Sequence, residues 1–433
     1  MIYFEEGAEV LHIQTHTSHV FIRGDDVIKI KKPVDFSFLD YSTLEKRKEC
    51  CEKEVALNRR FSPEVYVGVI PLFAGPDGLL AFEGGGEPVE YAVKMRRLPE
   101  ETMLAKRLAA GDVREDEMRA LADLLADFYS RAESTDEIRK FGGIGQVKEN
   151  TEENFETTLD FEEELFPDLT RQILWAANRR FLTANQDLFA ARAAAGRVLD
   201  GHGDLKPENL FLTPRGPVVT DCIEFNERFR FGDVLVDLGY LTMALQEAGR
   251  GDLRDVFLDR YAQVGEADFP RDLLAYYETY RAVVKGKIEG YRARQPEVPE
   301  AEREEARQIA LRHFRLALSI VLSKRPVLVI LTVPDDDLAP FVRNGLGARD
   351  DATPAALAGG ESVVVTGPDW AALAEAERAG AISVVVDRSG RGEPAEAAGA
   401  DLVLVMDGEG EPAAVRAGLA KTLAWALPGI ASE

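Results

Sequence analysis

The run His202-Gly203-Asp204-Leu205-Lys206-Pro207-Glu208-Asn209 carries the residue types that phosphoryl transfer from a nucleotide requires. An aspartate at position 204 can orient an acceptor hydroxyl and take its proton. Asn209 and Asp221, which ends a strand-like stretch, offer the oxygen ligands that Mg²⁺ prefers. Lys206 would lie beside the transferred group and offset its developing charge. A single match of this kind in a polar loop would be accidental. Five matches in the right order favour a phosphotransfer site.

A nucleotide also needs a cation on its α- and β-phosphates, held in place by a carboxylate on a neighbouring helix. The strand-like run Val27–Lys31 places Lys29 and Lys31 on one face, because strand side chains repeat every two residues. Counting from the preceding hairpin favours Lys29 and leaves Lys31 as the reserve; a pair of solvated edge-strand lysines is the alternative. Glu54 on the next helix is the expected partner, and Glu52 or a merely solvated helix face are the alternatives.

Two further segments are candidates for contact with the nucleotide. No glycine-rich loop precedes the first of these lysines, and the polar run Thr15–His19 stands in its place. The backbone N–H groups and hydroxyls of Thr17 and Ser18 can bind phosphate there, unless this run is an ordinary hairpin loop. Met95 and Arg97 follow the last strand-like run, where backbone groups should meet the adenine base.

The hydrophobic pattern divides the chain into three parts. The first hundred residues read as strands with one helix over 44–61, and glycine-rich turns separate the strands. From residue 101 the pattern is mainly helical, with expected helices over 118–131, 151–165, 169–181, 188–195 and within 233–322. Beyond about residue 323 short apolar strands at 327–332, 362–366, 382–386 and 402–406 alternate with helical stretches, which predicts an α/β unit with a mostly parallel sheet.

Composition narrows the partners and the compartment. At 433 residues the chain is long enough for two or three domains. Its formal charge of −24 argues against nucleic acid as a partner. No stretch approaches the roughly 18 apolar residues of a membrane helix, and the N-terminus lacks a signal-peptide pattern. These two observations lead us to expect no membrane partner. Three cysteines cannot form a disulfide framework, so we expect a cytoplasmic protein.

The chain resembles the aminoglycoside-phosphotransferase branch of the protein-kinase-like fold. The resemblance rests on the loop 202–209, on Asp221-Cys222-Ile223-Glu224-Phe225-Asn226, on the turn 15–19, on Lys29-Ile30-Lys31-Lys32-Pro33 and on Phe38-Leu39-Asp40. Gly203 stands where protein kinases usually carry arginine, which favours a small-molecule kinase, whereas Lys206 is more usual in protein Ser/Thr kinases. The resemblance implies a two-lobed α+β domain with a β-rich N-lobe (1–100) and a helical C-lobe (101–323).

The longer shared runs are similar to a subgroup in which this domain is fused to a C-terminal ATP-binding domain. No sequence of the form G-x-x-x-x-G-K-[ST] occurs in this chain, so a second nucleotide site of that type has no physical basis. We therefore predict that residues 324–433 form a non-catalytic α/β domain. Dimerisation between two copies, docking and regulation are the roles left open.

These observations predict a phosphotransferase that depends on ATP and Mg²⁺ and acts on a hydroxyl of a small molecule, such as an aminoglycoside-like amino sugar. In this interpretation Asp204 and Lys206 are catalytic, and Asn209 and Asp221 bind the metal. A protein Ser/Thr kinase is the first alternative. A nucleotide-binding pseudokinase or scaffold is the second. The whole proposal requires the acidic groups and the amide to converge around one cleft.

Overall fold

The computed structural model describes residues 9–36, 39–75, 78–324, 327–331, 363–366, 382–387 and 402–405. The chain forms two compact units. The first comprises Met1–Gly142 and Arg192–Phe269, and the second comprises Gly143–Ala191 and Pro270–Glu433. Every candidate site residue named above belongs to the first unit. The domain boundaries at 100 and 323 stay predictions.

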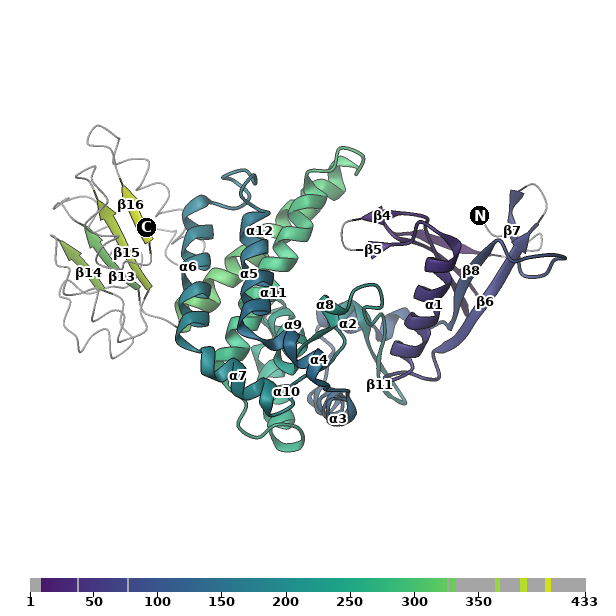
Figure 1. The fold of residues 1–433 in the computed structure, drawn as a ribbon, viewed down its shortest axis with the longest axis horizontal. Coiled ribbons are helices and arrows are strands. Elements are labelled where there is room, and N and C mark those ends of the chain that lie inside the picture. Colours follow the sequence, from purple (N-terminus) through teal and green to yellow (C-terminus); the bar gives the residue numbers. More distant parts are fainter. Residues whose placement is uncertain are drawn as a thin grey trace. The chain divides into compact units, whose positions relative to one another are not determined.

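The first unit begins with a six-stranded antiparallel sheet (Figure 1). Its strands are β1 (Leu11–Gln14), β2 (Ser18–Arg23), β3 (Asp26–Lys31), β6 (Tyr66–Ala74), β7 (Leu80–Ala81) and β8 (Glu90–Arg96), in the order β1-β2-β3-β8-β6-β7. The expected hairpin is confirmed, because β2 and β3 pair around a turn that contains Gly24. Two short strands, β4 (Asp35–Phe36) and β5 (Leu39–Asp40), pair separately.

Strand β3 separates its apolar and basic side chains onto opposite faces. Ile28 and Ile30 belong to an apolar cluster with residues of β2, β6 and β8. Lys29 and Lys31 alternate with them and contact helix α1 (Leu44–Asn58) instead. This alternation follows from the two-residue repeat of a strand, so the predicted shared face of the two lysines is confirmed.

Helix α1 covers the lysine-bearing face of this sheet (Figure 1). Thr43 caps its N-terminus by accepting a hydrogen bond from the Lys46 N–H. Cys51 and Val55 point inward and pack against a cluster that includes Tyr66. Glu54 lies on the same inward face and is fully buried. A buried carboxylate requires partners, and the strand supplies them.

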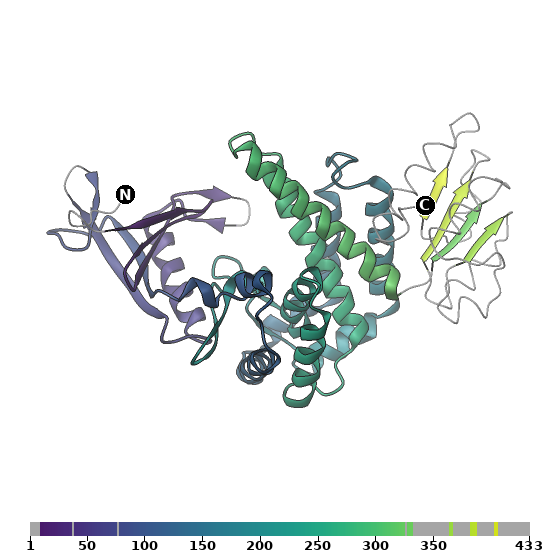
Figure 2. The same ribbon diagram turned by 180° about the vertical axis from the view of Figure 1, so that it is seen from behind.

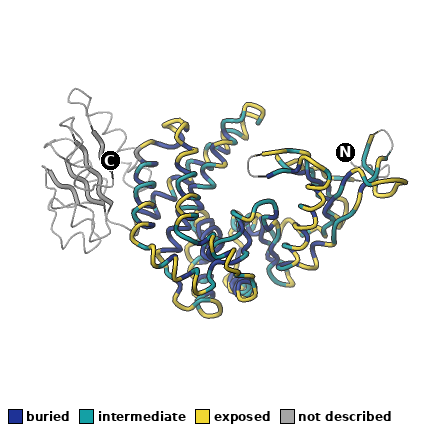
Figure 3. Tube along the Cα trace, in the orientation of Figure 1, coloured by how far each residue is buried: buried dark blue, intermediate teal, exposed yellow. Residues whose placement is uncertain are grey.

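The rest of the first unit holds the loops that follow the sheet. Its helices are α2 (Leu104–Ala110), α3 (Glu115–Arg131), α4 (Asp136–Arg139), α8 (Glu227–Arg230), α9 (Val234–Glu247) and α10 (Gly251–Val264). Its strands are β9 (Val198–Asp200), β10 (Leu210–Thr213), β11 (Gly216–Val219) and β12 (Phe231–Asp233), in the pairs β9–β12 and β10–β11. Helix α9 is buried along most of its length (Figure 3), so it forms the support on which the candidate loop rests.

The second unit is helical and then β. Its helices are α5 (Ile144–Glu156), α6 (Asp168–Ala184), most of α7 (Gln186–Ala194), α11 (Arg271–Ala293) and α12 (Glu300–Lys324). Helices α11 and α12 pack along each other (Figure 2). The helix expected over 151–165 is misplaced, since α5 starts earlier and ends at Glu156. The Thr158 hydroxyl donates to the carbonyls of Asn154 and Phe155 where this helix ends.

A parallel four-stranded sheet is described near the C-terminus. Its strands are β13 (Val327–Leu331), β14 (Val363–Thr366), β15 (Ile382–Asp387) and β16 (Leu402–Val405), in the order β14-β13-β15-β16. All four expected strands are present and parallel; the connections between them lie outside the described residues. Among the described residues, no helix combines the length and apolar character needed to cross a bilayer.

Candidate active site

The loop after β9 is fixed by one carboxylate from helix α9. The Asp237 carboxylate accepts hydrogen bonds from the backbone N–H groups of His202 (2.7 Å) and Gly203 (2.8 Å). A Cβ at Gly201 would lie 2.5 Å from Asp237 Oδ2, so only glycine leaves room for this carboxylate. Asp237 therefore sets the path of the loop, as a bracing residue at the start of the helix should. Asp233 caps the same helix by accepting a hydrogen bond from the Leu235 N–H.

Gly203 is required by the geometry of the loop. Its φ is +87°, a conformation that costs other residues strain. A Cβ there would lie 2.7 Å from the carbonyl oxygen of Phe229. Any side chain at this position, arginine included, would have to displace backbone.

His202 links the loop to the strand that ends at Asp221. The imidazole is fully buried; its Nδ1 accepts the Asp204 N–H at 3.2 Å, and its Nε2 lies 2.9 Å from the Thr220 carbonyl oxygen. Because Nδ1 is an acceptor, Nε2 carries the proton and donates it to Thr220. Burial lowers the pKa of His202 below its usual value, which favours this neutral form. These contacts give His202 a bracing role between the loop and the strand.

Asp204, Lys206 and Asn209 form one hydrogen-bonded group. The Lys206 ammonium lies 2.7 Å from Asp204 Oδ2, and Asn209 Nδ2 donates to the same oxygen at 3.0 Å. Both members of the ion pair are partly exposed, so solvent and a substrate can reach them. Burial opposes the charge of Lys206, but the Asp204 carboxylate outweighs it and raises the pKa of Lys206. Only Nδ2 of Asn209 takes part in these bonds, which leaves its Oδ1 oxygen available as an acceptor.

Asp221 adopts a conformation that is rare outside glycine. It is the one non-glycine residue with positive φ (62°) among the described residues, and such strain gathers at functional sites. Tyr66 Oη accepts its N–H at 3.0 Å, and the preceding Thr220 N–H donates to the Asn209 carbonyl at 2.9 Å. The side chain of Asp221 is 49% exposed. The Lys29 ammonium holds the pKa of Asp221 well below its usual value, so the carboxylate is ionised.

Lys29 bridges Asp221 and Glu54. Its ammonium lies 2.8 Å from Asp221 Oδ1 and 2.9 Å from Glu54 Oε1, and its side chain is 18% exposed. Burial alone would lower the pKa of Lys29, but Asp221 and Glu54 raise it well above its usual value. Glu52, the alternative partner, is exposed and lies 3.9 Å from Lys48 on the same helix. The structure thus brings Lys29, Glu54 and Asp221 together.

Lys31 has a different environment, although it shares the strand face. Its ammonium lies 2.7 Å from Glu54 Oε2 and contacts Glu224, and its side chain is only 1% exposed. Tyr41 Oη donates to Glu224 Oε1 at 2.7 Å and lies 3.4 Å from the same ammonium. These three partners leave Lys31 poorly placed to bind a phosphate, which favours Lys29.

Sequence reasoning missed Glu224, Tyr41 and the two bonds of Asp237 to the loop. Glu224 lies within the run that begins at Asp221, and Tyr41 follows the run that ends at Asp40. Their residue types alone do not predict that Glu224 pairs with Lys31 in the interior or that Tyr41 donates to it. A charged residue three positions after the candidate metal ligand was the available signal.

The remaining candidates lie at the turn between β1 and β2 and at the end of β8. Ser18 is buried and its N–H donates to Thr15 Oγ1 at 2.9 Å, whereas Thr17 is half-buried and its carbonyl accepts the Lys32 N–H at 2.8 Å. Met95 lies within β8 and pairs with Val27 and Tyr66, so the prediction that it follows the strand is wrong, whereas Arg97 does follow it. Met95 packs against the apolar cluster beside α1. The Arg97 N–H donates to the Asp25 carbonyl at 2.7 Å, so this N–H already has a protein partner.

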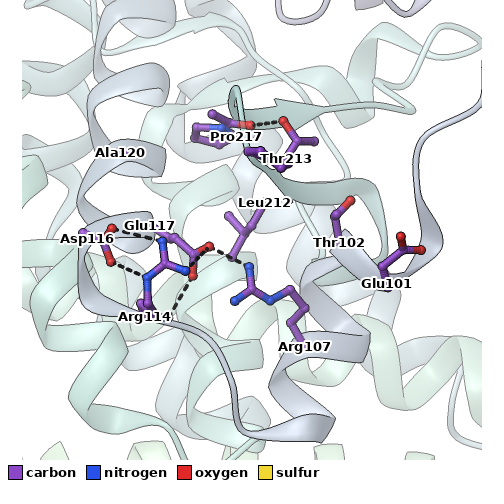
Figure 4. A pocket seen from close by; sticks show the side chains of 12 residues that line it. Glu101, Thr102, Arg107, Arg114, Asp116, Glu117, Ala120, Leu212, Thr213 and Pro217 are labelled. Carbon is purple, nitrogen blue, oxygen red and sulfur yellow. Dashed lines mark hydrogen bonds and ion pairs between the residues drawn. The ribbon is translucent and has the colours of Figure 1, made fainter.

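A hollow of about 570 Å³ lies in the same unit, on other residues (Figure 4). Residues of α2, α3 and the β10–β11 hairpin line it. Its two arginines, Arg107 and Arg114, share Glu117 as an ion-pair partner. None of the candidate catalytic or metal-binding residues lines this hollow, so it is separate from the chemistry described above.

Comparison with known sequences identifies the family. The profile of the phosphotransferase enzyme family, APH, matches residues 45–282, more than half of the chain. The chain belongs to this family, and its fold is kinase-like, with a curled antiparallel N-terminal sheet and a helical part after it. The resemblance stated from the catalytic loop is therefore confirmed.

Two mycobacterial relatives match a longer stretch. They are the uncharacterized protein Rv2004c of Mycobacterium tuberculosis and the uncharacterized protein Mb2027c of Mycobacterium bovis. Each is 35% identical over 314 residues, which cover 71% of this chain and 61% of the relative. The chain thus spans less than two thirds of the length of these relatives.

Several solved kinase structures are also similar. The amicoumacin kinase hAmiN, in complex with AMP-PNP, Ca²⁺ and Ami, has a TM-score of 0.45 at 12% identity, over 73% of this chain and 90% of that chain. A microcompartment-associated aminopropanol kinase has a TM-score of 0.43 at 13% identity, over 74% and 95%. A choline kinase from Cryptosporidium parvum has a TM-score of 0.42 at 13% identity, over 74% and 92%.

Proposed function

We propose that this chain is a phosphotransferase that uses ATP and Mg²⁺ to phosphorylate a hydroxyl group of a small molecule. The observation that carries the proposal is the cluster in which Lys29 bridges Glu54 and Asp221. The Lys–Glu pair and the carboxylate beside it are the parts that kinases use to hold nucleotide phosphates and metal. Membership of the phosphotransferase enzyme family supports the same conclusion.

The residues fit a hard divalent cation that takes most of its ligands from phosphates and water. Asp221 is ionised and half exposed, and Asn209 retains an amide oxygen. Asn209 and Asp221 would hold the Mg²⁺, which would neutralise negative charge on the phosphates. Lys29 would contact the α- and β-phosphates, with Glu54 fixing its ammonium.

In the transfer step the acceptor oxygen forms a bond to the γ-phosphorus as the bond between that phosphorus and the β-phosphate oxygen breaks, and ADP leaves. Asp204 accepts the proton of the acceptor hydroxyl. Lys206, which is paired with Asp204, offsets the negative charge that develops on the phosphoryl oxygens. Preorganised charges of this kind act without rearrangement during the reaction.

The geometry of Gly203 supports a small-molecule acceptor over a protein one, because the position cannot hold the arginine usual in protein kinases. An amino sugar or related metabolite is the acceptor class that we propose. The protein-kinase alternative keeps one feature in its favour, which is Lys206.

The test is a phosphate-transfer screen with γ-labelled ATP over amino sugars, sugars, nucleosides, amino alcohols and a generic protein substrate. We expect labelling of a small hydroxyl compound and none with Asp204→Ala. Labelling of the protein alone would favour the protein-kinase alternative. Binding of Mg-ATP without transfer to any acceptor would favour a pseudokinase.

A further inference from the structure

The second lysine of strand β3 is part of a buried ionic cluster that the proposed chemistry does not use. Lys31 and Glu54 are 1% and 0% exposed, and Glu224 is 7% exposed at its side chain. Burial would lower the pKa of Lys31, yet Glu224 and Glu54 raise it well above its usual value. Lys31 is thus a charged group held between two carboxylates.

This cluster joins three separate segments. Lys31 comes from the sheet, Glu54 from helix α1, and Glu224 from the stretch that begins with the candidate metal ligand Asp221. Tyr41, which donates to Glu224, stands just before the N-cap of the helix. The cluster therefore contacts the helix at Glu54, within it, and at Tyr41, just before its N-terminus.

Further buried contacts join the end of α1, and the turn that follows it, to the residues on either side of Asp221. Asn58 Oδ1 accepts the Cys222 N–H at 2.9 Å. Ser62 Oγ donates a hydrogen bond of 2.8 Å to the Val219 carbonyl oxygen. The Val219 N–H in turn donates to Ser62 Oγ at 3.1 Å. These contacts are complete within the chain itself, so no nucleotide is required to form them.

We propose that Lys31 and Glu224 are positioning residues that hold helix α1 in place, with Glu54 aligned on Lys29, before the nucleotide binds. This inference rests on the proposed function, because it concerns the pair that would hold the phosphates. In a kinase with a single Lys–Glu pair, outward movement of the helix separates that one pair. Here the same movement would also strip Lys31 of Glu54 and leave buried charges incompletely paired, which is strongly unfavourable.

The test compares amide hydrogen exchange in α1, residues 44–58, between the wild-type chain of 433 residues and the variant Lys31→Met/Glu224→Gln. This variant removes one positive and one negative charge together, so no lone charge is left by design. The matched control is Lys94→Met/Asp26→Asn, which removes an ion pair of 2.9 Å that is partly exposed on the same sheet. Mg-ATP at saturating concentration is the added probe.

In the wild type we expect the exchange of α1 to change less than twofold when Mg-ATP is added. In Lys31→Met/Glu224→Gln we expect at least tenfold faster exchange of α1, which Mg-ATP partly restores. The KM for ATP in the acceptor-independent hydrolysis should rise about tenfold, while kcat stays within threefold. A purely structural role would lower the folded fraction without this split.

Equal protection of α1 in the wild type and the double variant would overturn the proposal, as would a tenfold gain of protection in the wild type on binding Mg-ATP. If the double variant does not fold, the exchange of α1 is compared between the wild type and Tyr41→Phe instead. This variant should exchange about two- to threefold faster than the wild type. If the wild type binds no Mg-ATP, the proposed function fails, but the nucleotide-free comparison of α1 still decides whether the helix is held by this cluster.

Discussion

The ammonium group of Lys29 donates a hydrogen bond of 2.8 Å to the carboxylate of Asp221, although 192 positions separate the two residues. The contact joins the cation expected to hold phosphate to the carboxylate expected to hold metal. A nucleotide with its metal can therefore meet both charges in one place, and the following predictions test the parts of this arrangement.

Replacing Lys29 by methionine should weaken Mg-ATP binding at least tenfold. The variant removes the ammonium that faces Asp221, while Glu54 keeps Lys31 as its counter-ion. Calorimetric titration measures the affinity, and Lys94→Met on the neighbouring strand serves as the control. Equal affinities for the wild type and Lys29→Met would exclude a phosphate-binding role for this lysine.

Asp204→Asn should lower the rate of phosphoryl transfer by about 10²–10⁴-fold, the usual contribution of a general base. The affinity for Mg-ATP should change less than threefold, because Asp204 contacts Lys206 and Asn209 rather than Lys29, the lysine that we propose holds the phosphates. Single-turnover kinetics with labelled ATP separate the two quantities. A parallel loss of affinity and rate would place Asp204 among the nucleotide ligands instead.

Gly203→Ala should destabilise the protein by about 2 kcal/mol or more, through strain at positive φ combined with steric conflict. Its Cβ would lie 2.7 Å from the Phe229 carbonyl oxygen. Gly111→Ala is the control, because Gly111 also has positive φ but has no atom within 4 Å of an added Cβ. Denaturant unfolding compares the two, and a smaller loss at position 203 than at 111 would contradict the close approach.

The sequence pattern was sufficient for the local features of the site. Alternation in β3 placed Lys29 and Lys31 on one face, and Glu54 near the end of the next helix was the expected partner, which the structure confirms. It could not reveal that Glu224 pairs with Lys31 from 193 positions away, because such a pair depends on the packing of the whole unit. The left-handed backbone of Asp221 was equally hidden, since no residue type marks it.

The parallel sheet near the C-terminus was likewise predictable from the sequence only in part. Its four strands follow from short apolar runs, but their order, with β13 between β14 and β15, is not given by any one run. Strand order is decided by connections and packing that span the chain.

The stability of the protein should fall as the pH drops below about 6.5, in part because of His202. Burial lowers the pKa of His202 in the folded state, so the unfolded chain binds an extra proton in this range. The contribution is present above the unfolded pKa and is lost as the pH falls towards the lower folded pKa. Between pH 7 and 5.5 the stability attributable to this group should therefore decline steadily.

Denaturant unfolding of the wild type and His202→Gln across this range measures that contribution. The variant should be less stable at pH 7 but show a shallower pH dependence. Identical slopes for the two proteins would mean that His202 does not titrate differently on unfolding.

The most direct test of the central claim is a titration of ATP into the wild type and Asp221→Asn, with and without Mg²⁺. Asparagine tolerates the left-handed backbone of this position, so the substitution removes the charge without added strain. We expect Mg²⁺ to raise the affinity of the wild type for ATP at least tenfold and to have no such effect on Asp221→Asn. An equal, Mg²⁺-dependent affinity in both proteins would show that Asp221 does not hold the metal and would contradict the proposed site.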